Sequence, residues 1–177
     1  LAAPMPVILT GPAGSAAYFQ QIDEFIAATL GAKAQQRYQI IVDDPEEVAR
    51  VMLDGLVAVR EFRKQHGDAY YFNWRLRIDH EFQKPFTATH ASMSKLAISR
   101  DLPAHELAAN LRRAFSGLVS GNVREDTMAS IENDGPFEIS GSEEIMSLLD
   151  RLLAGFVADG RMKLESAHYR PCYRVRL

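Results

Sequence analysis

The chain has 177 residues, a length that suits one large domain or two small ones and excludes a long repeat array. Hydrophobic residues make up 47% and charged residues 24%, as in soluble globular proteins, and the single cysteine, Cys172, excludes an intrachain disulfide scaffold. The 20 lysines and arginines against 23 aspartates and glutamates give a net charge of −3, which argues against a nucleic-acid-binding surface. No stretch of the sequence is long and apolar enough for a membrane span. We therefore expect a cytoplasmic protein that binds neither nucleic acid nor membrane.

The first 66 residues carry the pattern of a parallel α/β sheet. Residues 6–10 are a short apolar run typical of a strand buried on both faces, and a glycine-rich loop, GPAG, closes it. A helical stripe over 15–31 leads to a second apolar run at 38–42, which completes a strand–helix–strand unit. The segment DDPEE then starts a long helix that runs to about residue 66. The stripe that we expect this helix to bury consists of Val48, Val51, Met52, Gly55, Leu56, Val59 and Phe62.

The parallel-sheet pattern stops near residue 67, and we place a domain boundary there. The elements expected beyond it are a half-buried strand at 71–78, a mostly loop segment at 79–102 with a short helix around 91–97, helices at 103–121, 123–133 and 142–160, and strands at 137–139 and 173–177. The predicted fold class is therefore α/β: a βαβα piece of a parallel sheet over residues 1–66, then a mainly helical α+β domain over residues 67–177. We expect the small sheet of the second domain to be antiparallel.

The loop from Thr10 to Ser15 is the best-placed candidate for ligand binding. It joins the carboxyl end of a parallel strand to the amino end of a helix, where backbone N–H groups and the helix dipole attract phosphate. It matches neither the dinucleotide-binding nor the P-loop glycine pattern, so an ordinary tight turn is the alternative. Asp43 also follows a strand, and it either reaches a sugar or acts as a base, or it helps to start the next helix.

Arg112 and Arg113 form the second candidate. Adjacent helical residues point about 100° apart, so one of the two arginines faces the core side. There it either pairs with a carboxylate or meets an anionic ligand or a neighbouring subunit. The histidines lack metal-ligand spacing: His105 begins like the zinc-protease motif, but Ala109 stands where the second ligand must be. Cys172 is expected to be a partly buried structural thiol.

Several blocks of sequence carry a family resemblance across essentially the whole chain. They are residues 6–12 (PVILTGP), 18–19 (YF), 41–47 (IVDDPEE), 68–74 (DAYYFNW), 111–117 (LRRAFSG), 155–157 (GFV) and 161–164 (RMKL). In this order they resemble the C-terminal portion of bacterial nucleotide 5'-monophosphate nucleosidases of the LOG, or lysine-decarboxylase-like, Rossmann family. The resemblance implies that residues 1–66 close a Rossmann-type nucleotide-binding domain and that residues 67–177 are the C-terminal domain of this subgroup.

The resemblance also implies an activity. The family hydrolyses the N-glycosidic bond of purine and pyrimidine nucleoside monophosphates to free base and ribose 5-phosphate, without a metal or redox cofactor. Its phosphate loop and catalytic glutamate belong to a P-G-G-x-G-T-x-x-E motif that this sequence lacks, so no catalytic residue is carried over. We expect that motif upstream of Leu1, and we expect the fragment to be inactive alone.

The residues expected to contact the substrate are Thr10, Gly11, Gly14, Ser15, Tyr18, Arg112 and Arg113. The nucleoside monophosphate is the expected small-molecule partner. The resemblance further implies a homo-oligomer and a guanosine alarmone as effector. The alternative hypothesis is a non-catalytic module for oligomerisation or regulatory nucleotide binding.

Overall fold

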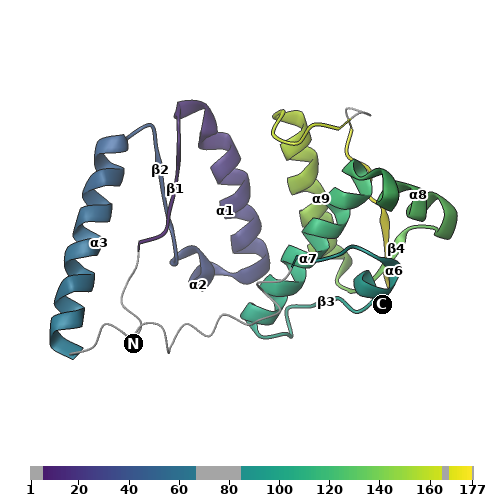
Figure 1. Ribbon diagram of the computed structural model, residues 1–177, viewed down its shortest axis with the longest axis horizontal. Coiled ribbons are helices and arrows are strands. Elements are labelled where there is room, and N and C mark those ends of the chain that lie inside the picture. Colours follow the sequence, from purple (N-terminus) through teal and green to yellow (C-terminus); the bar gives the residue numbers. More distant parts are fainter. Residues whose placement is uncertain (1–5, 67–84, 165–167, 177) are drawn as a thin grey trace. The chain divides into compact units, whose positions relative to one another are not determined.

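The computed structural model describes residues 6–66, 85–164 and 168–176 (Figure 1). Its contacts divide the chain into two compact units. Unit 1 consists of Leu1–Gln20 and Ala32–Lys84, and unit 2 of Gln21–Gly31 and Pro85–Leu177. The predicted strand at 71–78 lies outside the described residues, as does the predicted boundary at residue 67. No helix in the described ranges is both long and apolar enough to cross a membrane.

Unit 1 is built on a pair of parallel strands. Its elements are β1 (Ile8–Gly11), a 3-10 turn (Ala13–Ser15), the beginning of α1 (Ala16–Leu30), α2 (Ala32–Gln35), β2 (Gln39–Val42) and α3 (Pro45–His66). The register runs from Ile8 opposite Gln39 to Gly11 opposite Val42. In Figure 1, β1 and β2 lie side by side and α3 runs alongside them. The predicted parallel strand–helix–strand unit is therefore confirmed.

Helix α3 begins as its sequence predicts, but it is less buried than expected. Asp44 caps the helix, because its Oδ1 accepts a hydrogen bond of 2.8 Å from the N–H of Glu47. Of the predicted stripe, Val59 is buried at 7% exposure, whereas Met52 and Leu56 are 50% and 47% exposed.

The strands of unit 1 are also less buried than predicted. The side chains of β1 are half-buried or exposed, so the expectation of a strand covered on both faces is wrong. Two strands and one long helix offer too little apolar surface to cover all of these side chains at once.

Unit 2 holds most of the hydrophobic core. Its elements are the end of α1, α6 (His90–Met93), β3 (Ala97–Ile98), α7 (Ala104–Val123), α8 (Glu125–Asp134), β4 (Phe137–Gly141), α9 (Glu143–Ala158) and β5 (Tyr173–Arg176). The largest fully buried side chains are Met93, Ile98, Leu118, Phe137, Ile139, Ile145, Met146, Leu149 and Leu153. Ile22, Phe25 and Leu30 of α1 pack against this cluster. The helices at the centre of unit 2, α7 and α9, are thus amphipathic as predicted.

The sheet of unit 2 differs from the prediction in direction. Its strand order is β3-β4-β5, and both neighbouring pairs are parallel, so the predicted antiparallel sheet is wrong for the described strands. Two helices, α7 and α8, connect β3 to β4, and α9 connects β4 to β5. A helical crossover returns the chain to the end of the sheet from which it started, which makes successive strands parallel.

Two glycines on α7 permit close contacts. The helix continues through both Gly117 and Gly121. A Cβ at Gly117 would overlap the side chain of Met93, and one at Gly121 would overlap that of Cys172. Close packing is therefore the role of both glycines.

The C-terminal segment meets α7 at Asn122. This residue lies within the last turn of α7. Its Nδ2 donates to the backbone carbonyl of Arg170 at 3.0 Å, and its Oδ1 accepts from the N–H of the same residue at 3.0 Å. Asn122 therefore fastens the segment to α7.

Candidate functional site

The carboxyl ends of β1 and β2 form one edge of unit 1. Because the strands are parallel and Gly11 lies opposite Val42, the residues that follow each strand meet there. The N–H of Asp43 donates a hydrogen bond of 2.9 Å to the carbonyl of Gly11. This edge, which we call the carboxyl edge, therefore brings the loop from Thr10 to Ser15 next to Asp43. Open α/β sheets bind ligands at such edges.

The loop turns tightly after β1. Pro12 is extended, with φ −64° and ψ 165°, and its carbonyl accepts a hydrogen bond of 2.8 Å from the N–H of Ser15. Ser15 is buried at 6% exposure, and a Cβ at Gly11 would lie only 2.8 Å from its Oγ. A side chain at position 11 would therefore displace Ser15. Both residues hold the turn together, and Ser15 presents little side-chain surface to a ligand.

The open part of the loop lies on either side of this contact. Thr10 and Gly14 are exposed, and no heavy atom lies within 4 Å of the position that a Cβ of Gly14 would take. A ligand can therefore approach the backbone at Gly14 closely. Tyr18 follows on α1, half-buried, with its ring centroid 5.3 Å from that of Phe19. The structure thus brings five of the seven predicted substrate-contact residues to the loop and the first turn of α1.

Asp43 has an unusual backbone. It is the only non-glycine residue with a positive φ, 57°, among the residues that the structure describes. The left-handed conformation costs an L-residue of this kind about 1 kcal/mol, and such strain gathers at functional sites. The helix-capping role that the sequence left open for Asp43 belongs to Asp44. The side chain of Asp43 is exposed at the carboxyl edge, which places a carboxylate beside the loop.

Arg112 and Arg113 lie in unit 2, on α7, and both are half-buried. The Nε and Nη2 atoms of Arg112 are buried. The sequence prediction that one arginine of this pair faces inward is therefore confirmed for Arg112. Since the two arginines and the loop belong to different units, their role in contacting a substrate stays a prediction.

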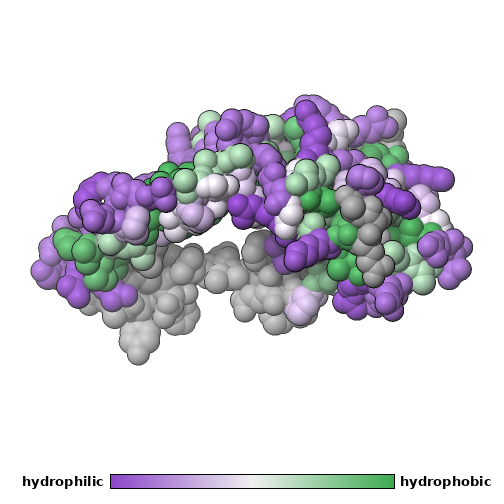
Figure 2. All heavy atoms as spheres, turned by 90° about the horizontal axis from the view of Figure 1, so that it is seen from above, coloured by the Kyte–Doolittle hydropathy of each residue, from purple (hydrophilic) through white to green (hydrophobic). Residues whose placement is uncertain are grey.

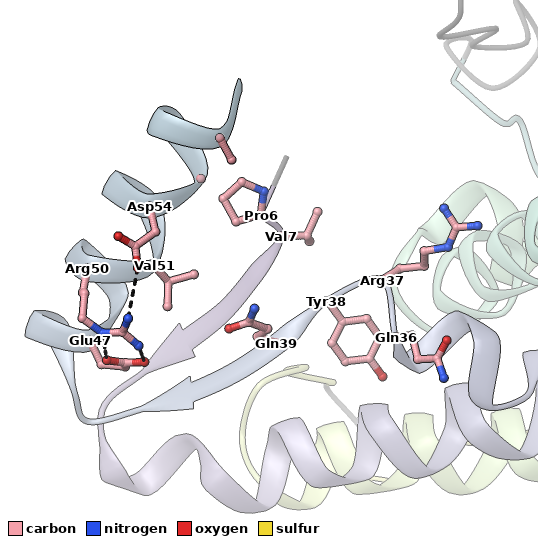
Figure 3. A pocket seen from close by; sticks show the side chains of 12 residues that line it. Pro6, Val7, Gln36, Arg37, Tyr38, Gln39, Glu47, Arg50, Val51 and Asp54 are labelled. Carbon is pink, nitrogen blue, oxygen red and sulfur yellow. Dashed lines mark hydrogen bonds and ion pairs between the residues drawn. The ribbon is translucent and has the colours of Figure 1, made fainter. Parts of the chain in front are cut away.

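A cavity of about 540 Å³ opens at the opposite end of the strand pair (Figure 3). Its lining comes from the beginnings of β1 and β2 and from α3, and includes Pro6, Val7, Gln39, Glu47, Arg50 and Asp54. The Nε of Arg50 donates a hydrogen bond to Oε2 of Glu47, and its Nη1 lies 3.0 Å from Oδ2 of Asp54. Two carboxylates therefore compensate its charge, which makes the cavity a poor anion site. The spacing of these three residues on a helix predicts such ion pairs, but no ligand site.

Sequence reasoning missed a cluster of two tyrosines around Asp150 in unit 2. Tyr169 Oη donates to Asp150 Oδ1 at 2.7 Å, and Tyr173 Oη donates to Oδ2 at 2.6 Å. Burial, and then these hydrogen bonds, raise the pKa of both phenols. The cluster fastens the C-terminal segment to α9, so its role is structural. Tyr169 and Tyr173 lie 19 and 23 residues after Asp150, so no local sequence pattern indicates that these side chains meet.

Cys172 lies beside this cluster and is 8% exposed. Burial raises the pKa of its thiol to about 11, so the reactive thiolate is scarce at neutral pH. We expect the folded chain to react with a disulfide reagent such as DTNB at pH 7.5 at least about 100-fold more slowly than the chain in 6 M guanidinium chloride, because the unfolded thiol has a pKa of about 8.5. Equal rates in the two solutions would contradict a buried thiol. The structural assignment of Cys172 predicts the slow rate.

The described residues contain no group of three or more histidine, cysteine, aspartate or glutamate side chains arranged to hold a metal ion. A ligand can also be held by hydrogen bonds and charge. The carboxyl edge offers both, through backbone N–H groups and the carboxylate of Asp43.

The chain is similar to known proteins over most of its length. Residues 56–176 match the family described as "Pyrimidine/purine nucleotide monophosphate nucleosidase, C-terminal". Curated relatives from Escherichia coli K12, O6:H1 and O157:H7 bear the name pyrimidine/purine nucleotide 5'-monophosphate nucleosidase. Each is 50% identical over 171 residues, which is 97% of this chain and 38% of the relative. The chain therefore spans well under half the length of these relatives.

Proposed function

Because the chain belongs to the pyrimidine/purine nucleotide monophosphate nucleosidase C-terminal family, we propose that it is the C-terminal part of an enzyme that hydrolyses the N-glycosidic bond of nucleoside monophosphates. The products are the free base and ribose 5-phosphate. The observation that carries this proposal is the 50% identity over 97% of the chain to enzymes that bear this name. The proposal includes the cytoplasmic location, the homo-oligomer and the alarmone effector that the resemblance implies.

In this proposal the carboxyl edge is one wall of the nucleotide site of a Rossmann-type domain. The exposed backbone at Gly14 and the N-terminus of α1 suit a phosphate, since both present N–H donors. Asp43 suits a ribose hydroxyl, because a carboxylate accepts hydrogen bonds from a diol. An oxocarbenium-like transition state also gains from a nearby negative charge. Thr10 and Tyr18 border this wall, and Arg112 and Arg113 are proposed as further anion contacts.

The chain supplies binding groups and lacks the family's P-G-G-x-G-T-x-x-E motif, so we propose that it has no turnover on its own. Incubation of the 177-residue chain with AMP or CMP should release no ribose 5-phosphate above background. The E. coli K12 relative, assayed alongside, serves as the positive control. Clear turnover by the isolated chain would contradict this division of roles.

Asp43 offers a direct test of the proposed wall. We expect Asp43→Asn to weaken AMP binding by about tenfold, a loss of roughly 1.4 kcal/mol, and to leave the thermal unfolding midpoint unchanged. Asparagine adopts the left-handed conformation as readily as aspartate but carries no charge. Isothermal titration calorimetry measures the affinity, and circular dichroism measures the unfolding.

The matched control is Asp44→Ala on the neighbouring residue. It removes the cap of α3 and should lower stability by about 1 kcal/mol with AMP affinity unchanged. If Asp43→Asn binds AMP as tightly as the unmodified chain, the carboxylate has no part in binding.

A further inference from the structure

Helix α1 belongs to both compact units. Its residues 16–20 lie in unit 1, and its residues 21–30 lie in unit 2. Figure 1 shows α1 as one continuous helix. Its first turn directly follows the loop from Thr10 to Ser15, so this turn belongs to the carboxyl edge. One helix therefore joins the proposed nucleotide wall to the C-terminal unit.

The first turn of α1 has little local support. Residues 16–20 span little more than one turn, whereas a helix that stands alone in water needs about 12 to 15 residues. The turn contains no acidic residue that would interact with the positive end of the helix dipole. Among residues 16–20, only Phe19 is buried, at 8% exposure. The helical state of this turn therefore depends largely on the rest of α1.

The rest of α1 packs into unit 2. Ile22, Phe25 and Leu30 contact the hydrophobic core of that unit. A Cβ at Gly155 of α9 would overlap the side-chain amide of Gln21, so α1 and α9 approach each other closely at this point. Burial of apolar side chains is the main source of helix stability in proteins. Unit 2 therefore supplies most of the interactions that keep α1 helical.

Arg100 fixes the C-terminal end of α1. The last four carbonyl groups of a helix have no partner within the helix. The Nη2 of Arg100 donates a hydrogen bond of 3.0 Å to one of them, the carbonyl of Ala28. Two further hydrogen bonds, each 2.9 Å long, join the guanidinium to the carboxylate of Glu144. A positive charge at this end also interacts favourably with the helix dipole. Arg100 therefore stabilises the end of α1 that lies opposite the proposed phosphate contact.

We propose that α1 couples the nucleotide wall to unit 2, and that Arg100 is a positioning residue for phosphate binding. Contacts in unit 2 favour the helical state of α1. A phosphate at the N-terminus favours the same state, because a helical first turn presents its free N–H groups together. Two interactions that favour one state strengthen each other, so the coupling is reciprocal. Arg100 acts through α1 and not by contact with the phosphate. This inference rests on the proposed function for its ligand.

Two matched pairs of variants test the coupling. Ala28→Gly lowers the helix propensity of α1 within unit 2, and Ala129→Gly makes the same substitution on α8. Arg100→Ala removes the hydrogen bond to α1, whereas Arg124→Ala removes an arginine that is paired with Asp126. All four positions are exposed, and hydrophilic side chains make up much of the surface in the right-hand part of Figure 2, where unit 2 lies. Each variant should therefore fold, which circular dichroism verifies.

The expected result is a selective loss of affinity. Ala28→Gly and Arg100→Ala should each weaken AMP binding by about threefold, whereas Ala129→Gly and Arg124→Ala should bind AMP as the unmodified chain does. Before AMP is added, the ¹³Cα chemical shifts of residues 16–20 should move toward random-coil values in the first two variants only. A merely structural role would lower the unfolding midpoint in both members of each pair and leave these readings unchanged. NMR measures the affinity and the shifts.

Failure of this inference differs from failure of the proposed function. If the unmodified chain binds AMP, and Ala28→Gly and Arg100→Ala bind it equally well, the coupling is overturned while the nucleotide wall stands. If the unmodified chain binds no AMP, the proposed wall fails and the coupling fails with it. Unchanged ¹³Cα shifts of residues 16–20 in both variants would overturn the role of unit 2 in holding the first turn, whatever the affinity.

Discussion

Replacing Gly141 by alanine is expected to lower the stability of unit 2 by about 3 kcal/mol and its unfolding midpoint by about 15 °C. Gly141 ends β4 with φ 138°, a conformation that L-residues rarely adopt. A Cβ there would collide with the backbone of Ile98, with which Gly141 pairs in the parallel ladder. The backbone of β3 cannot move away, because the N–H of Ser142 also bonds the carbonyl of Ile98 at 2.7 Å. Thermal unfolding followed by circular dichroism measures the change.

Gly135→Ala separates the cost of a positive φ from the cost of the collision with Ile98. Gly135 ends α8 with φ 86°, but no heavy atom lies within 4 Å of the position of its missing Cβ. The substitution should therefore cost only the left-handed strain, about 1 kcal/mol. If the two variants unfold at the same temperature, the close approach of β3 and β4 contributes nothing.

The second large effect is expected at Asp150. Alanine there removes the acceptor of both phenol hydrogen bonds and should destabilise unit 2 by about 2 kcal/mol, since Tyr169 and Tyr173 keep partial access to water. Asp159→Ala is the matched control: its carboxylate is exposed and accepts one hydrogen bond, 3.3 Å long, from Gln21. That variant should stay within about 0.5 kcal/mol of the unmodified chain. Urea unfolding monitored by circular dichroism measures both changes.

Because of the same cluster, we expect the free energy of unfolding to fall at high pH. The pKa of each phenol is raised in the folded chain. Below the ordinary tyrosine pKa of about 10, both phenols are therefore protonated in the folded and in the unfolded chain, and the cluster makes its full contribution to the free energy of unfolding. Above that pH the unfolded chain loses its phenol protons first, and stability falls. Tyr169→Phe/Tyr173→Phe should make this fall shallower between pH 10 and pH 11, because this variant lacks both phenols. An unchanged slope would mean that the two tyrosines do not titrate in this way.

The sequence predicted helix ends and buried helix faces, because these features depend on residues that are close together in the chain. The cap at Asp44 and the proline that follows it set the start of α3, and the positive φ of Gly31, Gly135 and Gly160 agrees with the helix ends expected there. The apolar stripe of α9 predicted a buried helix, and Leu149 and Leu153 are 1% and 0% exposed. These features depend on residues within one or two turns of each other.

Features that depend on distant partners were not predictable. The direction of β4 and β5 is set by the helices between the strands, and β3 has only two residues, too few for a periodic pattern. Met52 and Leu56 of α3 share the helical spacing of the buried Val59, so sequence periodicity alone counted these two exposed residues as core.

Some features of the candidate site were likewise predictable from the sequence, and others were not. The position of the loop from Thr10 to Ser15 at a strand end followed from the strand–helix–strand pattern. The inward packing of Ser15 against Gly11 and the left-handed backbone of Asp43 did not, because both depend on how the two strand ends meet. Helical spacing predicted that one arginine of α7 faces inward, but it gives no sign of what that arginine contacts.

The most direct test of the central claim is a titration of the ¹⁵N-labelled chain with AMP, followed by ¹H–¹⁵N NMR to about 10 mM ligand. The proposed nucleotide wall predicts saturable shifts for the amides of Thr10, Gly11, residues 13–18 and Asp43, with adenosine at the same concentrations giving weaker shifts because it lacks the phosphate. Saturable shifts confined to other residues, or no shifts at all, would contradict the assignment of the carboxyl edge as a nucleotide site.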